Sequence, residues 1–226
     1  MTTTSQHFRL RHVVSEDVAR VHAFHKEHLT EFLFPRTEEE FGGLADDQAL
    51  FEAVDAAGDT VAICYVRPVK NAKRTLEFGG VFVAESCRRC RLADALGLVA
   101  ITSLLLAFGV DANTTLIAHV HEFNEKPRNL LKRLGFLQTG QETIPEAERP
   151  PDIKLNDDGE LVGHVFTFDF ASCAGHAQWL EDFDGSLGSS LPGAAIEVPF
   201  FATRLDEALE ALRGIANGER HEAVNV

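Results

Sequence analysis

The sequence predicts a mixed α/β fold, in which one central β-sheet carries helices on both faces. Three observations support this prediction. Short stretches of alternating or β-branched residues recur along the chain, and a long uncharged helix directly follows a buried strand. The expected elements also interleave, in the order β-α-α-β-β-β-α-β-α-β-β. Because helices and strands are not segregated along the chain, the helices are expected to pack on both faces of a shared, mixed sheet.

The chain opens with a half-exposed strand and a helix. Phe8–Arg11 alternates apolar and charged residues, which is typical of a strand with one buried face. Ser15 is expected to cap the following helix, because serine is a favoured N-cap and Glu16 and Asp17 place negative charge in the first turn. Residues 32–40 are expected to form a second short helix or a loop.

Three histidines recur at every third position on the first predicted helix: His22, His25 and His28. This pattern is compatible with a metal-binding or pH-sensing cluster, but also with a solvated helical face. No matching set of ligands follows at a usual spacing, so we expect the solvated face.

The middle of the chain reads as a hairpin, a third strand and a long helix. Two strands, Ala49–Val54 and Thr60–Val66, flank a turn that contains Gly58. Leu76–Ala84 is the next strand and Leu92–Phe108 the long helix. The remaining expected elements are a strand at Thr115–His121, a helix at Glu125–Leu134 ended by Gly135, a strand at Phe136–Glu142, a mobile loop at Ile144–Gly159 and a strand at Val162–Phe170.

The elements named so far end near residue 170, so residues 1–170 are expected to form one domain. Residues 171–226 are then a C-terminal extension. Arg204–Ala216 within it is amphipathic, with leucines on one face. We expect the extension to be partly helical and to pack on its own domain or on a partner subunit.

Composition restricts the partners and the compartment. A formal net charge of -14 argues against nucleic acid or an anionic membrane as the main partner. The uncharged stretch Ala95–Val110 is shorter than the roughly 20 residues that span a bilayer. Four scattered cysteines form no disulfide framework, which fits a reducing cytoplasm, and Cys87-x-x-Cys90 lacks the partners of a zinc site. No metal is expected.

The stretch from Leu76 to Ala107 carries the clearest functional signal. Gly79-Gly80 allows another group to approach the strand closely, and Arg88, Arg89 and Arg91 lie in the turn that opens the long helix. A helix N-terminus presents unpaired backbone N–H groups and partial positive charge. This strand, turn and helix therefore predict an anion site, suited to a phosphate or pyrophosphate.

Two half-motifs add a family resemblance. The turn reads Arg88-x-x-Arg91-x-Ala93, and the later strand Thr115–His121 is followed by Asn124-x-x-Pro127-x-x-Leu130-Leu131-x-x-Leu134-Gly135-Phe136. In order and spacing these resemble the GNAT acyltransferases, whose motifs read Arg/Gln-x-x-Gly-x-Gly/Ala and Asn-x-x-Ala-x-x-Leu-Tyr-x-x-Leu-Gly-Phe. Two departures stand out: Arg91 replaces the first glycine and Leu131 replaces the tyrosine. The resemblance covers about Phe8 to Phe170.

The resemblance implies a splayed sheet that binds acetyl-CoA and transfers its acetyl group to a primary amine by direct attack in a ternary complex. The amine would belong to a small molecule or a peptide, and a homodimer is possible. The implied cofactor-binding residues are Val81, Phe82 and Val83 along the pantetheine, with the Val83 N–H on the thioester carbonyl, Arg88, Arg89, Cys90, Arg91, Leu92 and Ala93 around the pyrophosphate, Asn124 on the pantetheine or a water, and Arg128 on the 3′-phosphate.

For catalysis, Glu77 is the expected base, because several enzymes of the family carry a glutamate at this place on the central strand; the alternative is a glutamate at the strand end that faces solvent. A partly apolar cleft would raise its pKa towards neutrality. His119 and His121 share one face of the neighbouring strand, and either could be a base or proton shuttle or a hydrogen-bonded structural residue; as the catalytic candidate we select His121. Leu131 cannot protonate a thiolate as tyrosine would. A catalytically silent acyl-CoA-binding sensor therefore stays open as the alternative function.

Overall fold

The computed structural model describes residues 7–70, 72–88, 90–107, 114–168, 195–197, 210 and 213–214, and for residues 104–107 and 195–197 it describes the backbone alone. The elements, in chain order, are β1 (His7–His12), α1 (Val18–Glu27), α2 (Glu38–Asp46), β2 (Leu50–Val54), β3 (Thr60–Pro68), β4 (Thr75–Val83), α3 (Leu92–Ala107), β5 (Thr115–His121), α4 (Glu125–Arg133), β6 (Phe136–Ile144), β7 (Leu161–Phe168) and β8 (Ala195–Glu197), with short 3-10 turns at Ser15–Asp17, Glu85–Cys87 and Glu146–Glu148. From β1 to β7 this order is the one the sequence predicts.

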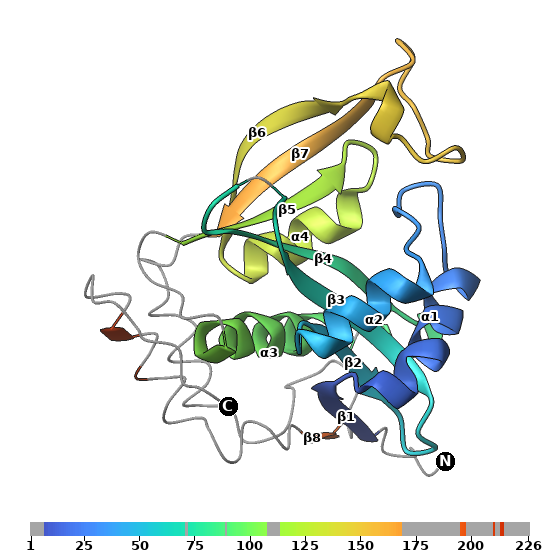
Figure 1. Cartoon of the computed structure of the whole chain (residues 1–226), viewed down its shortest axis with the longest axis vertical. Coiled ribbons are helices and arrows are strands. Elements are labelled where there is room, and N and C mark those ends of the chain that lie inside the picture. The colour runs from blue at the N-terminus through green and yellow to red at the C-terminus, as the bar shows by residue number, and fades with distance from the viewer. Residues whose placement is uncertain are drawn as a thin grey trace.

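The strands form a single mixed sheet in the order β6-β7-β5-β4-β3-β2-β1-β8 (Figure 1). Neighbouring strands are antiparallel, except that β4 and β5 are parallel and β1 and β8 are parallel. Strand β8 belongs to the expected C-terminal extension, and its three residues pair with His7, Phe8 and Arg9. The helix expected at 204–216 falls almost entirely outside the described residues.

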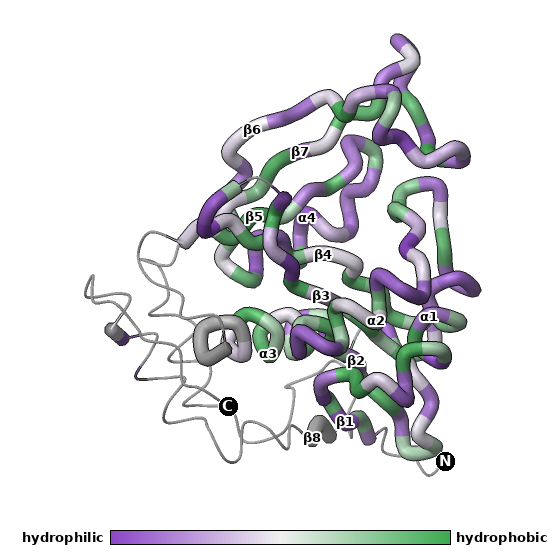
Figure 2. The backbone as a smooth tube through the Cα atoms, in the orientation of Figure 1, coloured by the Kyte–Doolittle hydropathy of each residue, from purple (hydrophilic) through white to green (hydrophobic). Residues whose placement is uncertain are grey.

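Helices cover both faces of the sheet, as predicted. Along β3, Cys64 and Val66 pack into the core beneath α3 and α4, whereas Ile63 and Tyr65 pack into a second core beneath α1 and α2. The hydropathy along the chain follows this arrangement, with β3 and α3 strongly apolar and the outlying β6 more polar (Figure 2). None of the helices within the described ranges has the length and apolar character needed to cross a bilayer.

The starts of the first two helices differ from the prediction. Ser15 lies inside a 3-10 turn and its hydroxyl donates to Asp46 (3.2 Å), so it does not cap α1. Helix α2 has the better cap, because Thr37 and Glu40 form a capping box in which each side chain bonds the other residue's backbone N–H (3.1 and 2.8 Å). The Thr37-x-x-Glu40 spacing in the sequence could have predicted this N-terminus of α2.

The prediction that the three histidines form a solvated face is wrong. His25 is 4% exposed and packs edge-on against Phe41 of α2, and burial lowers the pKa of His25 to about 4. His22 Nε2 hydrogen bonds to the Arg36 carbonyl (3.1 Å), and His28 Nδ1 to that of Phe24 (2.9 Å). Helix α2 and the segment just before it cover this face of α1. The spacing of histidines along one helix cannot predict such a contact with another element.

Candidate active site

The sheet opens between its two parallel central strands. Within the described strands, β4 pairs with β5 only where Thr75–Glu77 lies beside Thr115–Ile117. Strand β4 then continues to Val83 and β5 to His121, while β5 stays paired with β7 along Ile117–His121. The C-terminal part of β4, after Glu77, therefore has a free edge towards β5 (Figure 1), as the predicted splayed sheet requires.

A β-bulge in the pairing of β3 with β4 changes the backbone direction of β4 at this free edge. Tyr65 lies opposite Gly79 and Ile63 opposite Phe82, so β4 has one residue more than β3 in this interval. Gly80 takes a left-handed conformation there, with φ +61°. Such a bulge changes which backbone groups of a strand face each neighbour, and it lies at the point where β4 parts from β5.

Beyond the bulge, the backbone of Val83 faces away from β3. The Ala84 N–H donates to the Val61 carbonyl of β3 (2.8 Å), and peptide groups alternate in direction along a strand, so Val83 points to the other side. The Arg88 Nε group donates to the Val83 carbonyl (3.1 Å) from that side, which agrees with this orientation. The open edge thus presents backbone groups to which an extended ligand could add as a strand.

The turn into α3 places a residue with left-handed backbone directly before the helix. Arg91 adopts φ +59°, and its carbonyl accepts the N–H of Ala95 (3.1 Å). The N–H groups of the helix's first turn, Leu92 to Asp94, precede this bond and have no acceptor within the helix. Arginine at the family's glycine position therefore keeps the left-handed backbone that glycine usually supplies.

The predicted phosphate-binding side chains have other partners in this structure. Besides its bond to Val83, Arg88 lies over the Phe82 ring (5.7 Å to the ring centroid). Arg91 is near Asp94 (3.7 Å), whose carboxylate also forms a two-pronged ion pair with Arg133 (2.5 and 3.0 Å). The side chains of Arg88 and Arg91 thus already have partners within the protein.

The other predicted cofactor-binding residues differ in whether their side chains already have a hydrogen-bond partner. Asn124 is the N-cap position of α4, where its side chain makes no capping bond. Arg128 donates to the Glu122 carbonyl, so it is turned towards its own chain. Cys90 is buried and its thiol donates to the Cys87 carbonyl (2.9 Å). Arg89 falls outside the described residues.

The two cysteines and the other possible ligands form no metal site in the part of the chain that the structure describes. Cys87 and Cys90 are both buried free thiols there. No three histidine, cysteine, aspartate or glutamate residues of that part come together as a metal-binding group would.

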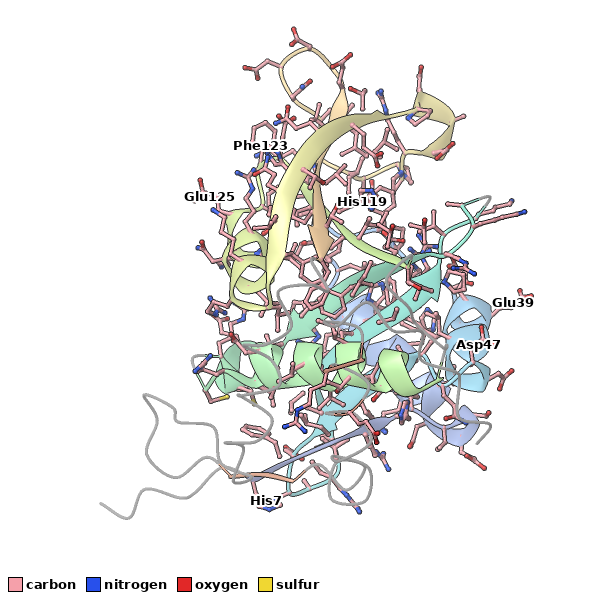
Figure 3. The ribbon with its side chains drawn as sticks, turned by 90° about the vertical axis from the view of Figure 1, so that its left-hand side faces the viewer. His7, Glu39, Asp47, His119, Phe123 and Glu125 are labelled. Carbon is pink, nitrogen blue, oxygen red and sulfur yellow. The ribbon has the colours of Figure 1, made fainter. Side chains whose placement is uncertain are left out.

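Glu77 is the centre of an ionic network on the α1–α2 face of the sheet. Its carboxylate accepts from Arg67 Nε (2.7 Å) and pairs with His119 Nδ1 (3.1 Å). His119, labelled in Figure 3, also contacts Glu142 of β6 through Nε2 (3.0 Å). Only 14% of the Glu77 side chain is accessible, against 29% for His119 and 45% for Glu142. The network thus leads from the sheet surface at β3 and β4 out to the edge strand.

The pKa of Glu77 differs from the sequence expectation. Burial favours a higher value, but the hydrogen bond from His119 and the charge of Arg67 outweigh burial and lower the pKa of Glu77. The same hydrogen bond raises the pKa of His119 against the opposite effect of burial. Glu77 is therefore ionised at neutral pH. The expected rise towards neutrality is wrong, because the sequence did not place these two cations beside it.

His121 is engaged at both ring nitrogens. Nδ1 accepts the Phe123 backbone N–H (3.2 Å), so the proton lies on Nε2, which is 2.7 Å from the Lys154 carbonyl. A neutral imidazole bonded in this way has no free lone pair for a substrate proton. This geometry favours a structural role for His121, and of the two histidines on β5 it is His119 that joins Glu77.

Two loops meet beside His121, and sequence reasoning did not pair them. The Lys154 N–H donates to the Glu31 carbonyl (3.0 Å), which joins the β6–β7 loop to the α1–α2 loop. The Lys154 ammonium lies 5.7 Å from the Phe32 ring and 5.2 Å from that of Phe123, which Figure 3 labels near the start of α4. Only the folded chain shows this contact, because the two loops lie far apart in the sequence.

Arg36 and Arg67 also escaped sequence reasoning. Arg67 lies opposite Glu77 in the β3–β4 register, which the structure shows and the sequence analysis did not predict. Arg36 lies in the segment before α2 and donates to the Tyr65 hydroxyl (3.0 Å), a contact with no sequence signal. Leu131, at the family's tyrosine position, is 3% exposed and packs in the core.

Comparison with known proteins identifies the fold. The sequence matches no protein-family model and has no significant match among curated proteins. Among solved structures, a GNAT-family acetyltransferase from Streptococcus pneumoniae aligns over 71% of this chain and 98% of its own, with 15% identity and a TM-score of 0.54. NAA60 of Arabidopsis thaliana, crystallised with a bisubstrate analogue, aligns over 71% and 97%, with 14% identity and a TM-score of 0.53.

A third similar structure is the NatC complex bound to Gag peptide and CoA. It aligns over 72% of this chain and 98% of its own, with 13% identity and a TM-score of 0.55. All three structures align over nearly their whole length with the mixed, opened sheet and helices described above. The chain therefore has the fold of the GNAT acetyltransferases.

Proposed function

We propose that this protein is an N-acetyltransferase that moves the acetyl group of acetyl-CoA to a primary amine by direct attack in a ternary complex. The observation that carries the proposal is the opening between β4 and β5, with a bulge on one side and the amides of the α3 turn beyond it. The similar structures, which include acetyltransferases and a complex with CoA, support the same activity.

In this proposal the chain binds acetyl-CoA mainly through its backbone. The pantetheine adds to the free edge of β4 at Val81–Val83, and the Val83 N–H polarises the thioester carbonyl. The pyrophosphate is held by the first-turn amides of α3, where the helix dipole favours negative charge. Arg88 and Arg91 add positive charge at the turn, and Arg88 leaves the Val83 carbonyl when the pantetheine takes its place.

Glu77 is the proposed base, with His119 as the group that passes the proton on. An acceptor amine is mostly an ammonium at neutral pH, and it must lose a proton before it can attack the thioester. Glu77 is ionised and can receive that proton through a water. His119 touches Glu77 on one side and the exposed Glu142 on the other, so it links the buried carboxylate to bulk solvent.

The test is turnover of acetyl-CoA with a panel of primary amines, followed as free thiol. Glu77→Gln should lower kcat by about 10²-fold or more, the usual range for loss of a general base, and leave the Kd for CoA unchanged. Glu39→Gln is the matched control, because it removes an exposed carboxylate on α2 that is not part of the Glu77 network. Wild-type rates in the Glu77→Gln variant would exclude this residue as the base.

A catalytically silent acyl-CoA sensor is the second candidate function, and Leu131 is the observation that favours it. A buried leucine at that position removes the usual proton donor for the departing thiolate. Binding of CoA that raises the melting temperature, without turnover of any amine in the panel, would select this function.

A further inference from the structure

The only tyrosine of the sequence, Tyr65, packs against the bulge of β4 from the neighbouring strand. Tyr65 is on β3, is 6% exposed, and packs its ring against Gly79 and Gly80. A Cβ atom on Gly79 would lie 3.0 Å from the hydroxyl oxygen, and one on Gly80 would overlap the ring. Two consecutive glycines therefore let the ring lean from β3 across β4, so that the hydroxyl reaches the strand that borders the opening.

Arg36 fixes this hydroxyl in place. Its Nη2 donates to the Tyr65 oxygen (3.0 Å), its guanidinium lies 5.3 Å from the ring centroid, and its Nη1 pairs with Glu40 (2.9 Å). Since the Tyr65 oxygen accepts from Arg36, its own proton points elsewhere. Within the described residues that proton has no acceptor. A buried O–H donor without an acceptor is costly, and such groups often mark a functional site.

The hydroxyl lies on the same face of the sheet as the proposed base. Tyr65 is opposite Gly79 and Arg67 is opposite Glu77, and side chains two residues apart on a strand share a face. The charged groups around the hydroxyl are Arg36, Arg67 and Glu77. Burial raises the pKa of Tyr65, Arg36 acts in the opposite direction, and Glu77 adds to the rise. The phenol therefore keeps its proton at neutral pH, while Arg36 can stabilise a phenolate.

We propose that Tyr65 is the proton donor to the departing CoA thiolate, in place of the tyrosine that Leu131 replaces, with Arg36 as its positioning residue. This inference rests on the proposed acetyl transfer. As the C–N bond forms and the C–S bond breaks, the electron pair left on sulfur takes the Tyr65 proton. The first proton of the ammonium has already left through Glu77 and His119 to solvent. Glu77 then takes, through water, the second proton that the attacking nitrogen loses as the amide forms, and this second proton returns through water to the phenolate. The products are the acetylated amine and CoA as a free thiol.

Tyr65→Phe is the direct test, because it keeps the ring in its place against the glycines and removes only the hydroxyl. We expect kcat to fall by about 10²–10⁴-fold, the range for a positioned acid, with an unchanged Kd for acetyl-CoA. The fall in wild-type rate at alkaline pH, where the phenol loses its proton, should be missing in this variant. Arg36→Met should move that alkaline fall to higher pH, since it removes the charge that favours the phenolate.

Ser103→Ala is the matched control. It also deletes a buried hydroxyl, but one on α3 that has no hydrogen-bond partner among the described residues. Turnover in this variant should equal that of the wild type. If Tyr65→Phe also turns over at the wild-type rate, Tyr65 is not the donor and the inference is overturned.

A second measurement does not depend on turnover. CoA and desulfo-CoA differ only at the thiol, so a contact between Tyr65 and sulfur makes wild-type protein prefer CoA, and Tyr65→Phe removes that preference. An equal preference in both proteins overturns the inference. If no amine is acetylated by wild type and the preference still depends on Tyr65, the proposed transfer fails while the contact between Tyr65 and sulfur is supported.

Discussion

Arg91 offers the sharpest test of how the α3 turn is built. Its φ of +59° is a conformation that costs a residue with a Cβ atom about 1–2 kcal/mol. Glycine removes this cost but loses about 0.4–1 kcal/mol, because its unfolded chain has more freedom. Arg91→Gly should therefore be more stable than Arg91→Ala by about 0.5–1 kcal/mol. Both variants lose the same ion pair with Asp94, so the difference isolates the backbone.

The assay is denaturant and thermal unfolding of both variants without ligand. For a chain of this length the melting temperature should differ by about 1–4 °C. Against wild type, Arg91→Gly also loses a half-exposed pair at 3.7 Å, which is worth little. Equal stability of the two variants, or a more stable alanine variant, would refute the argument from backbone conformation. If the Arg91 charge assists phosphate binding, both variants should weaken CoA binding to the same extent.

Two further predictions concern stability. Gly80→Ala should lower the free energy of unfolding by about 1–3 kcal/mol, because φ at this position is +61° and the new Cβ overlaps Tyr65. The denaturant midpoint measures this loss. The control is Gly42→Ala, in open space on α2, which should raise the free energy of unfolding by about 0.5–1 kcal/mol. Because the pKa of His119 is raised, its ion pairs stabilise the fold fully below pH about 6.5 and lose their effect as pH rises through the folded value. The stability advantage of wild type over His119→Gln should thus shrink from pH 6 to 9, and an advantage that grows over this range would contradict the ion-pair account.

The sequence was sufficient for the fold because its main signals are local. Period-2 alternation, the uncharged run of α3 and Gly58 in its hairpin each depend on residues close together in the chain. The opening of the sheet was predicted from the two motifs around Arg88 and Asn124, because their resemblance to the GNAT motifs implies the splayed sheet of that family.

Tertiary structure decided the chemistry of the site. The pKa of Glu77 depends on Arg67 and His119, which reach it from other strands, and the Tyr65 hydroxyl depends on Arg36 and on glycines across the sheet. Electrostatic interactions and hydrogen bonds act through space over a few ångströms. Residues far apart in the sequence therefore set the charge and the proton position of each group, and only the folded chain brings them together.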